Sequence, residues 1–414
     1  MVKGRLLFVT DVTLFPLDQG MRVRVANLLA ACTSVFAVTL IAPMPEDETG
    51  RAWLEGLCDR TVWLGEQRAT GGIGAVGAWW AAYRAAPGIR SLAAVRRYAL
   101  FVAAIRTLDL SEYDLIWAER PHIARLFARQ RTRTIIDFDD IEHRRISQTL
   151  SPGLVRPWSP AFLVSLYRMR LYRWLELSWS RDFLAKVVCS EEDQHYLESN
   201  GCHRIVVVPN GTNAAATETG VGSSCRTATE PLKVVFLGNI AHQPNLDAVT
   251  YFADDILFRL KAVYPDTFFD VLGPSAGPQI RERFSSRATF RGFVPDLQAA
   301  LSNYDIFVAP IRLGSGTRVK LLDAMACRIP IVTTPAGAAG LPVVDGEHLL
   351  LAHDASDFAE KVVRLKSDPA LGVRLATNAA ALVEARFRSP AIRDLVARWL
   401  EGMACSMASD ANHG

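Results

Sequence analysis

The feature of this sequence that most constrains its fold is a repeated alternation of short apolar runs with longer segments of helical spacing. Residues 5–10 and 35–42 are rich in Leu, Val, Ile and Phe, and residues 23–31 between them place apolar side chains at helical intervals. This alternation is typical of βα units stacked around a parallel sheet, so the sequence predicts an α/β fold. Further elements of the first half are expected as strands at residues 113–118, 134–138 and 186–189 and as a helix at 91–108.

The same alternation restarts after residue 230 and predicts a second domain of similar size. Its strands are expected at residues 232–237, 268–272, 288–291, 305–309, 331–333 and 348–351, with helices at 246–263 and 297–301. Residues 213–230 are mostly Ala, Thr, Ser and Gly, which is the composition of a linker. We therefore expect domains at 1–212 and 231–388, a helix at 389–402 that packs back toward the first domain, and a disordered tail at 403–414.

Composition excludes several classes of protein. Lys and Arg number 46 against 43 Asp and Glu, which is far from the clustered basic charge of a nucleic-acid-binding protein. The seven cysteines show no C-x-x-C spacing, which argues against a zinc site or a disulfide framework and favours reduced thiols. The longest uncharged stretch, residues 69–83, is shorter than the roughly 20 residues of a membrane span, and the first apolar run is too short for a signal peptide. We expect a cytoplasmic protein with no nucleic-acid partner.

Ligands of parallel sheets bind at the carboxyl ends of the strands, so the loops that follow the strands are the candidate sites. The loop at residues 11–20 has no G-x-G-x-x-G and no acidic residue about 20 positions later, which argues against an NAD-dependent dehydrogenase. Gly20 is followed by Arg22 and Arg24 at the expected start of a helix, where free N–H groups favour an anion. The alternative is a plain glycine turn with two solvated arginines.

A stronger candidate lies at residues 309–326. A strand is expected to end near the start of this segment, a Gly-Ser-Gly-Thr loop lets the backbone approach a ligand, and a helix is expected from about Thr317. Thr317, Lys320 and Asp323 then line one polar stripe of that helix, which suits the diphosphate and the ribose of a nucleotide. The alternative is an i,i+3 Lys–Asp pair on a solvated helix face.

These residues resemble the nucleotide-sugar site of glycosyltransferases with the GT-B fold, the large family often called family 4 or glycosyl transferases group 1, in its Gly-Ser-Gly-Thr-Arg branch. The resemblance covers nearly the whole chain, and the matching segments are the loop at Gly20 and residues 188–190, 207–213, 234–240, 271–273, 290–294 and 314–326. The resemblance implies two Rossmann-like domains whose parallel sheets face a central cleft. It also implies transfer of a sugar from a nucleoside diphosphate sugar to an acceptor hydroxyl, with retention of configuration, no metal and no cofactor.

Carried over residue by residue, the resemblance implies a donor site in the second domain that the start of the first helix completes. The expected donor-binding residues are Gly20, Arg22, Gly238, Asn239, Arg312, Gly314, Ser315, Gly316, Thr317, Arg318, Lys320 and Asp323. The nucleotide base is expected to lie against Phe293 and Val294.

This chain departs from the family pattern at four positions. Family members often carry two glutamates where this chain has Ser315 and Asp323, and Asp323 is expected to keep the contact with the ribose. They also carry an Arg and a Lys where this chain has Asn239 and Asn245. A diphosphate in a water-poor cleft needs positive charge, so the three cations within residues 312–320 are the expected replacements.

The first domain is expected to supply the acceptor pocket and a group that orients or deprotonates the acceptor hydroxyl. Glu119 and Asp140, each shortly after an expected strand, are the predicted catalytic residues. The alternative for the loop that contains Asp140 is that Asp139 or Asp140 caps a helix while Glu142 and His143 are solvated. The D-x-D at residues 137–139 is not expected to hold a metal, because the resemblance implies basic side chains and a helix dipole in its place.

Two aromatic segments leave a choice between packing and binding. Residues 157–179 mix Trp and Tyr with Arg, as a helix resting on anionic lipid does. Leucines recur there as a core-facing set with snorkelling arginines, so packing is the favoured interpretation and contact with a membrane is the alternative. The cluster at Trp79 and Trp80 either edges an acceptor cleft or fills a helix interface.

The leading hypothesis is a glycosyltransferase that acts in glycan, glycolipid or glycosylated-metabolite synthesis, such as polysaccharide biosynthesis. Its location would be the cytoplasm, with the inner face of the membrane as the alternative. The competing functions are a nucleotide-sugar epimerase of the same fold and a non-catalytic sugar-nucleotide-binding protein, the latter because Ser315 supplies no carboxylate. No sequence pattern specifies the sugar, the base, the acceptor or an oligomeric state.

Overall fold

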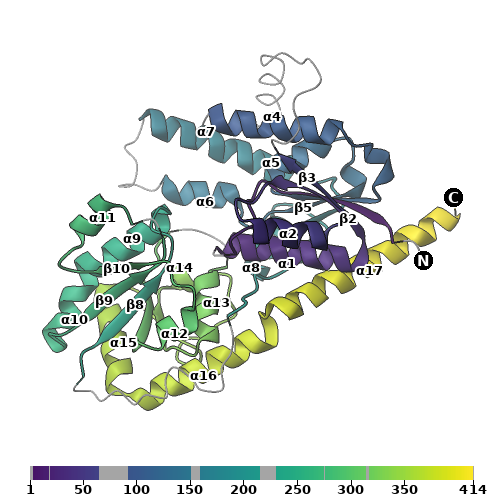
Figure 1. Cartoon of the computed structure of the whole chain (residues 1–414). Coiled ribbons are helices and arrows are strands. Elements are labelled where there is room, and N and C mark those ends of the chain that lie inside the picture. Colours follow the sequence, from purple (N-terminus) through teal and green to yellow (C-terminus); the bar gives the residue numbers. More distant parts are fainter. Residues whose placement is uncertain are drawn as a thin grey trace. The chain divides into compact units, whose positions relative to one another are not determined.

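The computed structural model describes residues 3–17, 19–64, 92–150, 159–214, 230–274, 276–313 and 317–413. It divides into two compact units, Met1–Asn210 with Pro390–Gly414, and Gly211–Ser389 (Figure 1). The glycine loop at residues 314–316, most of the expected linker, and the cluster at Trp79 and Trp80 lie outside the described residues. Each unit is built on a parallel sheet with helices, which confirms the expected α/β fold.

The first unit is built on a seven-stranded parallel sheet in the order β3-β2-β1-β4-β5-β6-β7. The strands are β1 (Arg5–Val9), β2 (Ala37–Pro43), β3 (Arg60–Leu64), β4 (Leu115–Glu119), β5 (Thr134–Asp137), β6 (Ala185–Val188) and β7 (Ile205–Val207). All five expected strands are present, and β3 and β7 are additional. β3 begins with Arg and Thr, so it does not stand out as an apolar run. β7 is a short apolar strand that was not among the expected strands.

Helices cover both faces of this sheet. They are α1 (Gly20–Val35), α2 (Glu48–Leu57), α4 (Leu92–Arg106), α5 (Pro121–Ala124), α6 (Glu142–Thr149), α7 (Pro160–Trp174), the helical turn η4 (Leu175–Trp179), α8 (Glu191–Ser199) and α17 (Ser389–His413). Leu6 and Phe8 of β1 face a core that also holds side chains of α1, α2 and α17. Leu7 and Val9 face a second core, with side chains of α4, α5 and α8. Burial on both faces explains why β1 is apolar at every position but its first.

The last helix, α17, extends beyond the range 389–402 expected from the sequence. Ile392, Val396 and Leu400 recur at four-residue intervals and are buried in the first of the two cores of this unit. The helix then continues through the segment where a disordered tail is expected and ends at His413. The residues that follow this buried stripe are mostly Ala, Met and Ser, with no proline that would stop a helix.

The second unit has a six-stranded parallel sheet in the order β10-β9-β8-β11-β12-β13. Its strands are β8 (Lys233–Leu237), β9 (Phe268–Leu272), β10 (Thr289–Gly292), β11 (Ile306–Ala309), β12 (Ile331–Thr333) and β13 (Leu350–Leu351), all six of them expected from the sequence. Its helices are α9 (Gln243–Tyr251), η6 (Phe252–Ile256), α10 (Leu257–Val263), α11 (Pro278–Arg283), α12 (Leu297–Leu301), α13 (Val319–Ala326), α14 (Pro335–Ala338), α15 (Ala355–Ser367) and α16 (Pro369–Arg386). Because β9, β8 and β11 are neighbours and parallel, the loops that leave them meet at one edge of the sheet.

Candidate functional site

The second unit gathers polar residues where β8 and β9 end. β8 leads into Gly238 and Asn239, and β9 leads into Gly273, whose φ of +127° lies in the region that favours glycine. A Cβ at Gly273 would lie 2.3 Å from the carbonyl oxygen of Gly238, and a Cβ at Gly238 would lie 2.9 Å from Nζ of Lys320. The two glycines therefore let Lys320 of α13 lie directly against the loop that follows β8.

Lys320 is the cation at the centre of this cluster. Its Nζ donates to Oδ1 of Asn245 at 2.5 Å and lies 4.5 Å from the centre of the Phe236 ring. Nδ2 of Asn245 in turn donates to the carbonyl oxygen of Asn239 at 2.8 Å, so the amide joins the lysine to the loop. Burial, with a smaller effect of the Arg318 charge, lowers the pKa of Lys320 to about 7. Near neutral pH the cluster can therefore gain a positive charge when an anion arrives.

Asp323, one turn further along α13, has a different partner. Its Oδ1 accepts a hydrogen bond from Oγ1 of Thr212 at 2.6 Å. Burial raises the pKa of Asp323 to about 6, although the Thr212 hydrogen bond and the Lys320 charge oppose the shift. The alternative of a solvated Lys–Asp pair is wrong, because these two partly buried side chains bind residues from distant segments instead of each other.

The two predicted arginines of this region are both engaged. Arg312 donates two hydrogen bonds to the carboxylate of Asp247, at 3.1 and 2.8 Å, and its guanidinium lies 4.2 Å from the centre of the Tyr251 ring. Arg318 donates to the carbonyl oxygen of Leu313 at 3.3 Å. A diphosphate would have to compete with Asp247 for Arg312, so Lys320 and Arg318 are the better placed of the three expected cations.

Thr317 does not belong to the polar stripe that is expected along α13, so this part of the prediction is wrong. The helix begins at Val319, and Arg318 before it has extended backbone angles, so the buried Thr317 precedes the helix and does not share its face with Lys320 and Asp323. Gly314, Ser315 and Gly316 lie outside the described residues. Their contacts with a donor stay predictions.

The residues expected to hold the base lie just after β10. Phe293 is 59% exposed and Val294 is partly buried. An exposed aromatic ring beside the carboxyl end of a strand is free to stack on a base, and this contact stays a prediction.

The start of α1 in the first unit is the other expected part of the donor site. The helix begins at Gly20, and Gln19 before it makes no side-chain hydrogen bond to the first turn. Arg22 donates to the carbonyl oxygen of Pro16 at 2.9 Å. The part of Gly20 and Arg22 in donor binding stays a prediction.

Arg24, also on α1, is buried in an ion pair. Nε and Nη2 donate to the two carboxylate oxygens of Asp137 at 3.0 and 2.7 Å. Nη1 donates to the carbonyl oxygen of Val208 at 2.7 Å and to Oδ1 of Asn210 at 3.0 Å. The network ties α1 to the ends of β5 and β7, so the picture of two solvated arginines is wrong. Asp137, the first residue of the D-x-D, is thus paired with Arg24. The described residues contain no group of three acidic, His or Cys side chains placed to hold a metal ion, and the absence of a metal from the reaction stays a prediction.

Glu119, the last residue of β4, is fully buried. Its Oε2 accepts a hydrogen bond from Oγ1 of Thr10 at 2.6 Å, and its Oε1 lies 3.9 Å from Nε of Arg120. Burial raises the pKa of Glu119 to about 8 against the opposing charge of Arg120. A buried carboxyl that is mostly protonated at neutral pH is a poor base. The catalytic role of Glu119 stays a prediction, and Glu119 would have to act through Thr10 and Arg120.

Three polar residues at the same sheet edge match no sequence motif. Nε2 of His122 lies 3.1 Å from Oδ2 of Asp11, and Nη1 of Arg120 lies 3.8 Å from Oδ1 of Asp11. Arg120 has a φ of +72°, a strained backbone region for a residue with a side chain. Only their positions after strands could have indicated them from the sequence, since Asp11 follows β1 and Arg120 and His122 follow β4.

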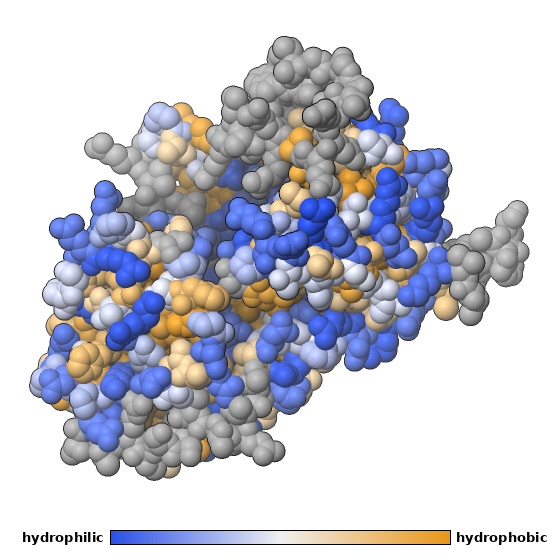
Figure 2. Space-filling view, viewed as in Figure 1, coloured by the Kyte–Doolittle hydropathy of each residue, from blue (hydrophilic) through white to orange (hydrophobic). Residues whose placement is uncertain are grey.

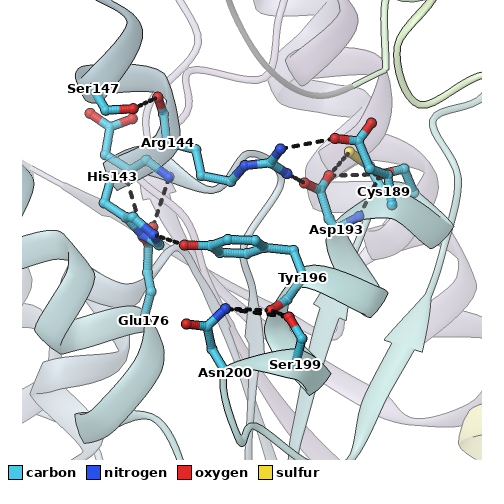
Figure 3. A network of polar contacts seen from close by, with 12 residues as sticks. His143, Arg144, Ser147, Glu176, Cys189, Asp193, Tyr196, Ser199 and Asn200 are labelled. Atoms are coloured by element: carbon cyan, nitrogen blue, oxygen red, sulfur yellow. Dashed lines mark hydrogen bonds and ion pairs between the residues drawn. The ribbon is translucent and has the colours of Figure 1, made fainter. Parts of the chain in front are cut away.

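The loop after β5 leads into a buried hydrogen-bond network (Figure 3). His143 of α6 places Nδ1 at 2.5 Å from Oε2 of Glu176 and Nε2 at 2.7 Å from the hydroxyl of Tyr196. Glu176 also accepts the backbone N–H groups of Glu142 and His143, at 2.8 and 3.2 Å. The cap of α6 thus comes from η4 and not from an aspartate of the loop, and the alternative of a solvated His143 is wrong.

Asp140 follows β5 and interacts electrostatically with Cys189 after β6 and with Arg145 of α6. It is partly buried, and its charge adds to the burial that raises the pKa of the Cys189 thiol. The charge of the same carboxylate also helps to raise the pKa of the Arg145 guanidinium. These neighbours place Asp140 at the carboxyl edge of the sheet, and its catalytic role stays a prediction.

Comparison with known proteins connects the second unit with one family. Residues 231–368 match the family model of glycosyl transferases group 1. Over 105 residues the chain is 34% identical to the lipopolysaccharide core biosynthesis mannosyltransferase LpcC of Rhizobium leguminosarum bv. viciae, a stretch that makes up 25% of this chain and 30% of that protein. The chain spans less than half the length of the curated relatives that it matches.

Solved structures resemble the chain over nearly its whole length. Alr3699/HepE of Anabaena, in complex with UDP and glucose, matches with a TM-score of 0.64 and 17% identity over 96% of this chain and 99% of that one. Sucrose-phosphate synthase of Thermosynechococcus elongatus matches with a TM-score of 0.68 and 16% identity over 98% and 100%. At such identities the likeness shows the fold. The chain therefore has the GT-B fold of glycosyltransferases, as the resemblance implied, and its second unit matches the group 1 family.

Proposed function

We propose that this chain is a glycosyltransferase that moves a sugar from a nucleoside diphosphate sugar to an acceptor hydroxyl. The observation that carries the proposal is the cluster of Lys320, Asn245 and the glycine loop at the end of β8, within the segment that matches group 1. The solved relative from Anabaena holds UDP and glucose, and LpcC is named as a mannosyltransferase. Both support a donor of this class.

In this proposal the donor diphosphate lies against the loop at Gly238, with Lys320 and Arg318 as its cations and without a metal. Negative charge on the diphosphate grows as the glycosidic bond breaks, so a nearby ammonium stabilises the transition state more than the bound donor. Asp323 keeps its hydrogen bond with Thr212 through Oδ1 and accepts a ribose hydroxyl through Oδ2. The proposed stereochemical outcome is retention.

Incubation of the pure protein with candidate donors tests this function. UDP-glucose and a mannose-bearing nucleoside diphosphate are supplied with and without a panel of hydroxyl acceptors, and the anomeric proton is followed by NMR. A retaining transferase hydrolyses its donor slowly alone and forms a glycoside of unchanged configuration with an acceptor. Rapid conversion of the donor sugar without an acceptor would identify an epimerase. Tight binding without turnover on any acceptor would identify a binding protein.

We further propose that the protein works in the cytoplasm, in the synthesis of a glycan or glycolipid. The six described cysteines are free, which suits a reducing compartment. Cell fractionation tests the location, and recovery of the protein from an oxidising compartment would contradict it.

A further inference from the structure

One helix of the first unit presents apolar side chains to solvent. Leu163, Val164, Tyr167 and Trp174 of α7 are each between 46 and 57% exposed. Leu163, Tyr167, Arg170 and Trp174 recur at intervals of four, three and four residues, so they lie along one side of the helix. The outward side of a helix in contact with water normally carries polar side chains. In Figure 2 apolar side chains reach the surface in the region where Figure 1 places α4 and α7.

The favoured interpretation of residues 157–179 as core packing is therefore right for only part of the segment. Leu175 and Leu177, in η4, are buried as expected. Arg168 is also buried and lies 3.5 Å from the carboxylate of Glu142, on the side of α7 that faces α6. Leu163, which the core-facing set includes, lies on the outward side.

The charged residues of α7 itself are all positive. α7 contains three arginines and no acidic residue, and Arg170 and Arg173 are exposed. α4 contains no acidic residue either. Arg125 interacts electrostatically with Tyr98 of α4 and with Tyr167 of α7, so the two helices flank the same cation. The two acid-free helices thus lie close together on one side of the unit.

Helix α10 also has exposed apolar side chains and can be compared with α7. Its residues Phe258 and Val263 are as exposed as the apolar residues of α7. They are preceded by Asp254 and Asp255 of η6, so carboxylates accompany the cations of that helix. Isolated apolar residues among mixed charges are ordinary on a protein surface. On α7 the apolar stripe, the aromatic rings and cations without acids occur together.

We propose that the α7 surface, defined as Leu163, Val164, Tyr167, Arg170, Arg173 and Trp174, docks the first unit onto an anionic lipid bilayer. The helix lies in the plane of the interface, with its apolar side chains at the boundary between headgroups and acyl chains. Tyr and Trp rings are amphipathic and suit that boundary, and the arginines pair with lipid phosphates. None of the described helices is long and apolar enough to span a membrane. A second copy of the chain fits this surface less well, because it would bring the same arginines against each other.

Co-sedimentation with lipid vesicles tests the proposal. The full chain is mixed with vesicles of phosphatidylcholine alone or with about one third phosphatidylglycerol, in low and in high salt. Three variants accompany the wild type: Leu163→Gln with Tyr167→Ser and Trp174→Gln, Arg170→Gln with Arg173→Gln, and the matched control Phe258→Ser with Val263→Ser. All the substituted side chains are exposed, so the folds are expected to survive, and circular dichroism verifies this.

The wild type and the α10 control are expected to sediment with the anionic vesicles and to be released by high salt. Loss of both arginines is expected to lower the partition into these vesicles about thirtyfold. The apolar variant is expected to lower it about tenfold or more. Three results would overturn the proposal: no sedimentation of the wild type, equal sedimentation of the wild type and the apolar variant, or equal binding to neutral and anionic vesicles. A concentration-dependent dimer that the apolar variant abolishes, without vesicle binding, would also overturn it.

This inference stands apart from the proposed transferase activity. Vesicle binding is measured without any nucleotide, and donor binding is assigned to the second unit. A protein that sediments with anionic vesicles but binds no nucleoside diphosphate would refute the proposed function alone. A protein that binds the nucleotide but no vesicle would refute this surface alone.

Discussion

Binding of the donor is expected to be accompanied by uptake of a proton at Lys320. Burial lowers the pKa of this lysine to about 7, so about half of the unbound molecules carry a neutral amine at that pH. A diphosphate beside Nζ stabilises the ammonium and returns the pKa toward the ordinary lysine value of about 10.4. Because the donor prefers the protonated lysine, its affinity is expected to fall as the pH rises above 7.

The size of the effect follows from the pKa of the unbound state. Between pH 7 and 8.5 the charged fraction of Lys320 falls from about one half to about one thirtieth, so Kd is expected to rise about sixteenfold, or about 1.6 kcal/mol. At pH 8 each binding event takes up about 0.9 proton. Asp323, whose pKa is about 6, is almost fully ionised throughout this range and adds little.

Calorimetry in two buffers with different ionisation enthalpies measures the proton uptake directly. A nucleoside diphosphate sugar is the right ligand, because it lacks the terminal phosphate that itself titrates near pH 6. Lys320→Met is expected to bind more weakly at pH 7 and to take up no proton above it. Lys361→Met, which removes a lysine paired with Asp357 on α15, is the control that should leave the uptake unchanged. Less than about 0.2 proton taken up by the wild type at pH 8, or the same uptake in Lys320→Met, would refute the reasoning.

Three further outcomes are expected. Asp323→Ala should weaken binding of the nucleoside diphosphate by about 1.5–3 kcal/mol in calorimetry while Thr212→Val leaves it within a few fold, and equal affinity of Asp323→Ala and wild type would exclude the ribose contact. Arg24→Ala should lower the free energy of unfolding of the first unit by about 3–5 kcal/mol in urea, because it leaves a buried carboxylate unpaired, whereas Arg51→Ala removes an exposed pair and should cost less than about 1 kcal/mol. Similar losses of unfolding free energy in Arg24→Ala and Arg51→Ala would contradict this expectation. Because the raised pKa of Glu119 makes the folded state bind more protons than the unfolded state, stability should fall from pH 5 to pH 8. In thermal unfolding measured at several pH values, Glu119→Gln should show a smaller fall in stability than the wild type. The same pH dependence of stability in both proteins would contradict the role of Glu119.

The strands could be predicted because their burial is a local property of the sequence. Every residue of β11 is buried, so an unbroken apolar run marks it. β3 was missed because its first two residues, Arg60 and Thr61, interrupt that signal at the edge of the sheet. The expected start of α13 at Thr317 was early because helical spacing does not show where the backbone leaves the extended conformation.

The contacts of the site could not be predicted in the same way. Asp323 and Thr212 are 111 residues apart, and Lys320 and Asn245 are 75 apart, so no window of local periodicity contains both partners. The composition of residues 157–179 favoured core packing, with an interfacial helix as the alternative, because both sides of α7 carry apolar and arginine side chains. Which side faces water became evident only from the packing against α6.

The hydrogen bonds at the two ends of the second unit have a practical consequence. The backbone N–H of Thr212 donates to the carbonyl oxygen of Phe387 at 2.9 Å, and the N–H of Ser389 donates to the carbonyl oxygen of Thr212 at 3.2 Å. The second unit therefore begins and ends side by side, like a domain inserted into a host, and residues 211–389 are expected to fold when expressed alone and to bind the nucleotide. Cutting the gene once at residue 210 would instead strip α17 from the core of the first unit. The excision that respects the fold removes the middle of the chain and rejoins its two outer parts.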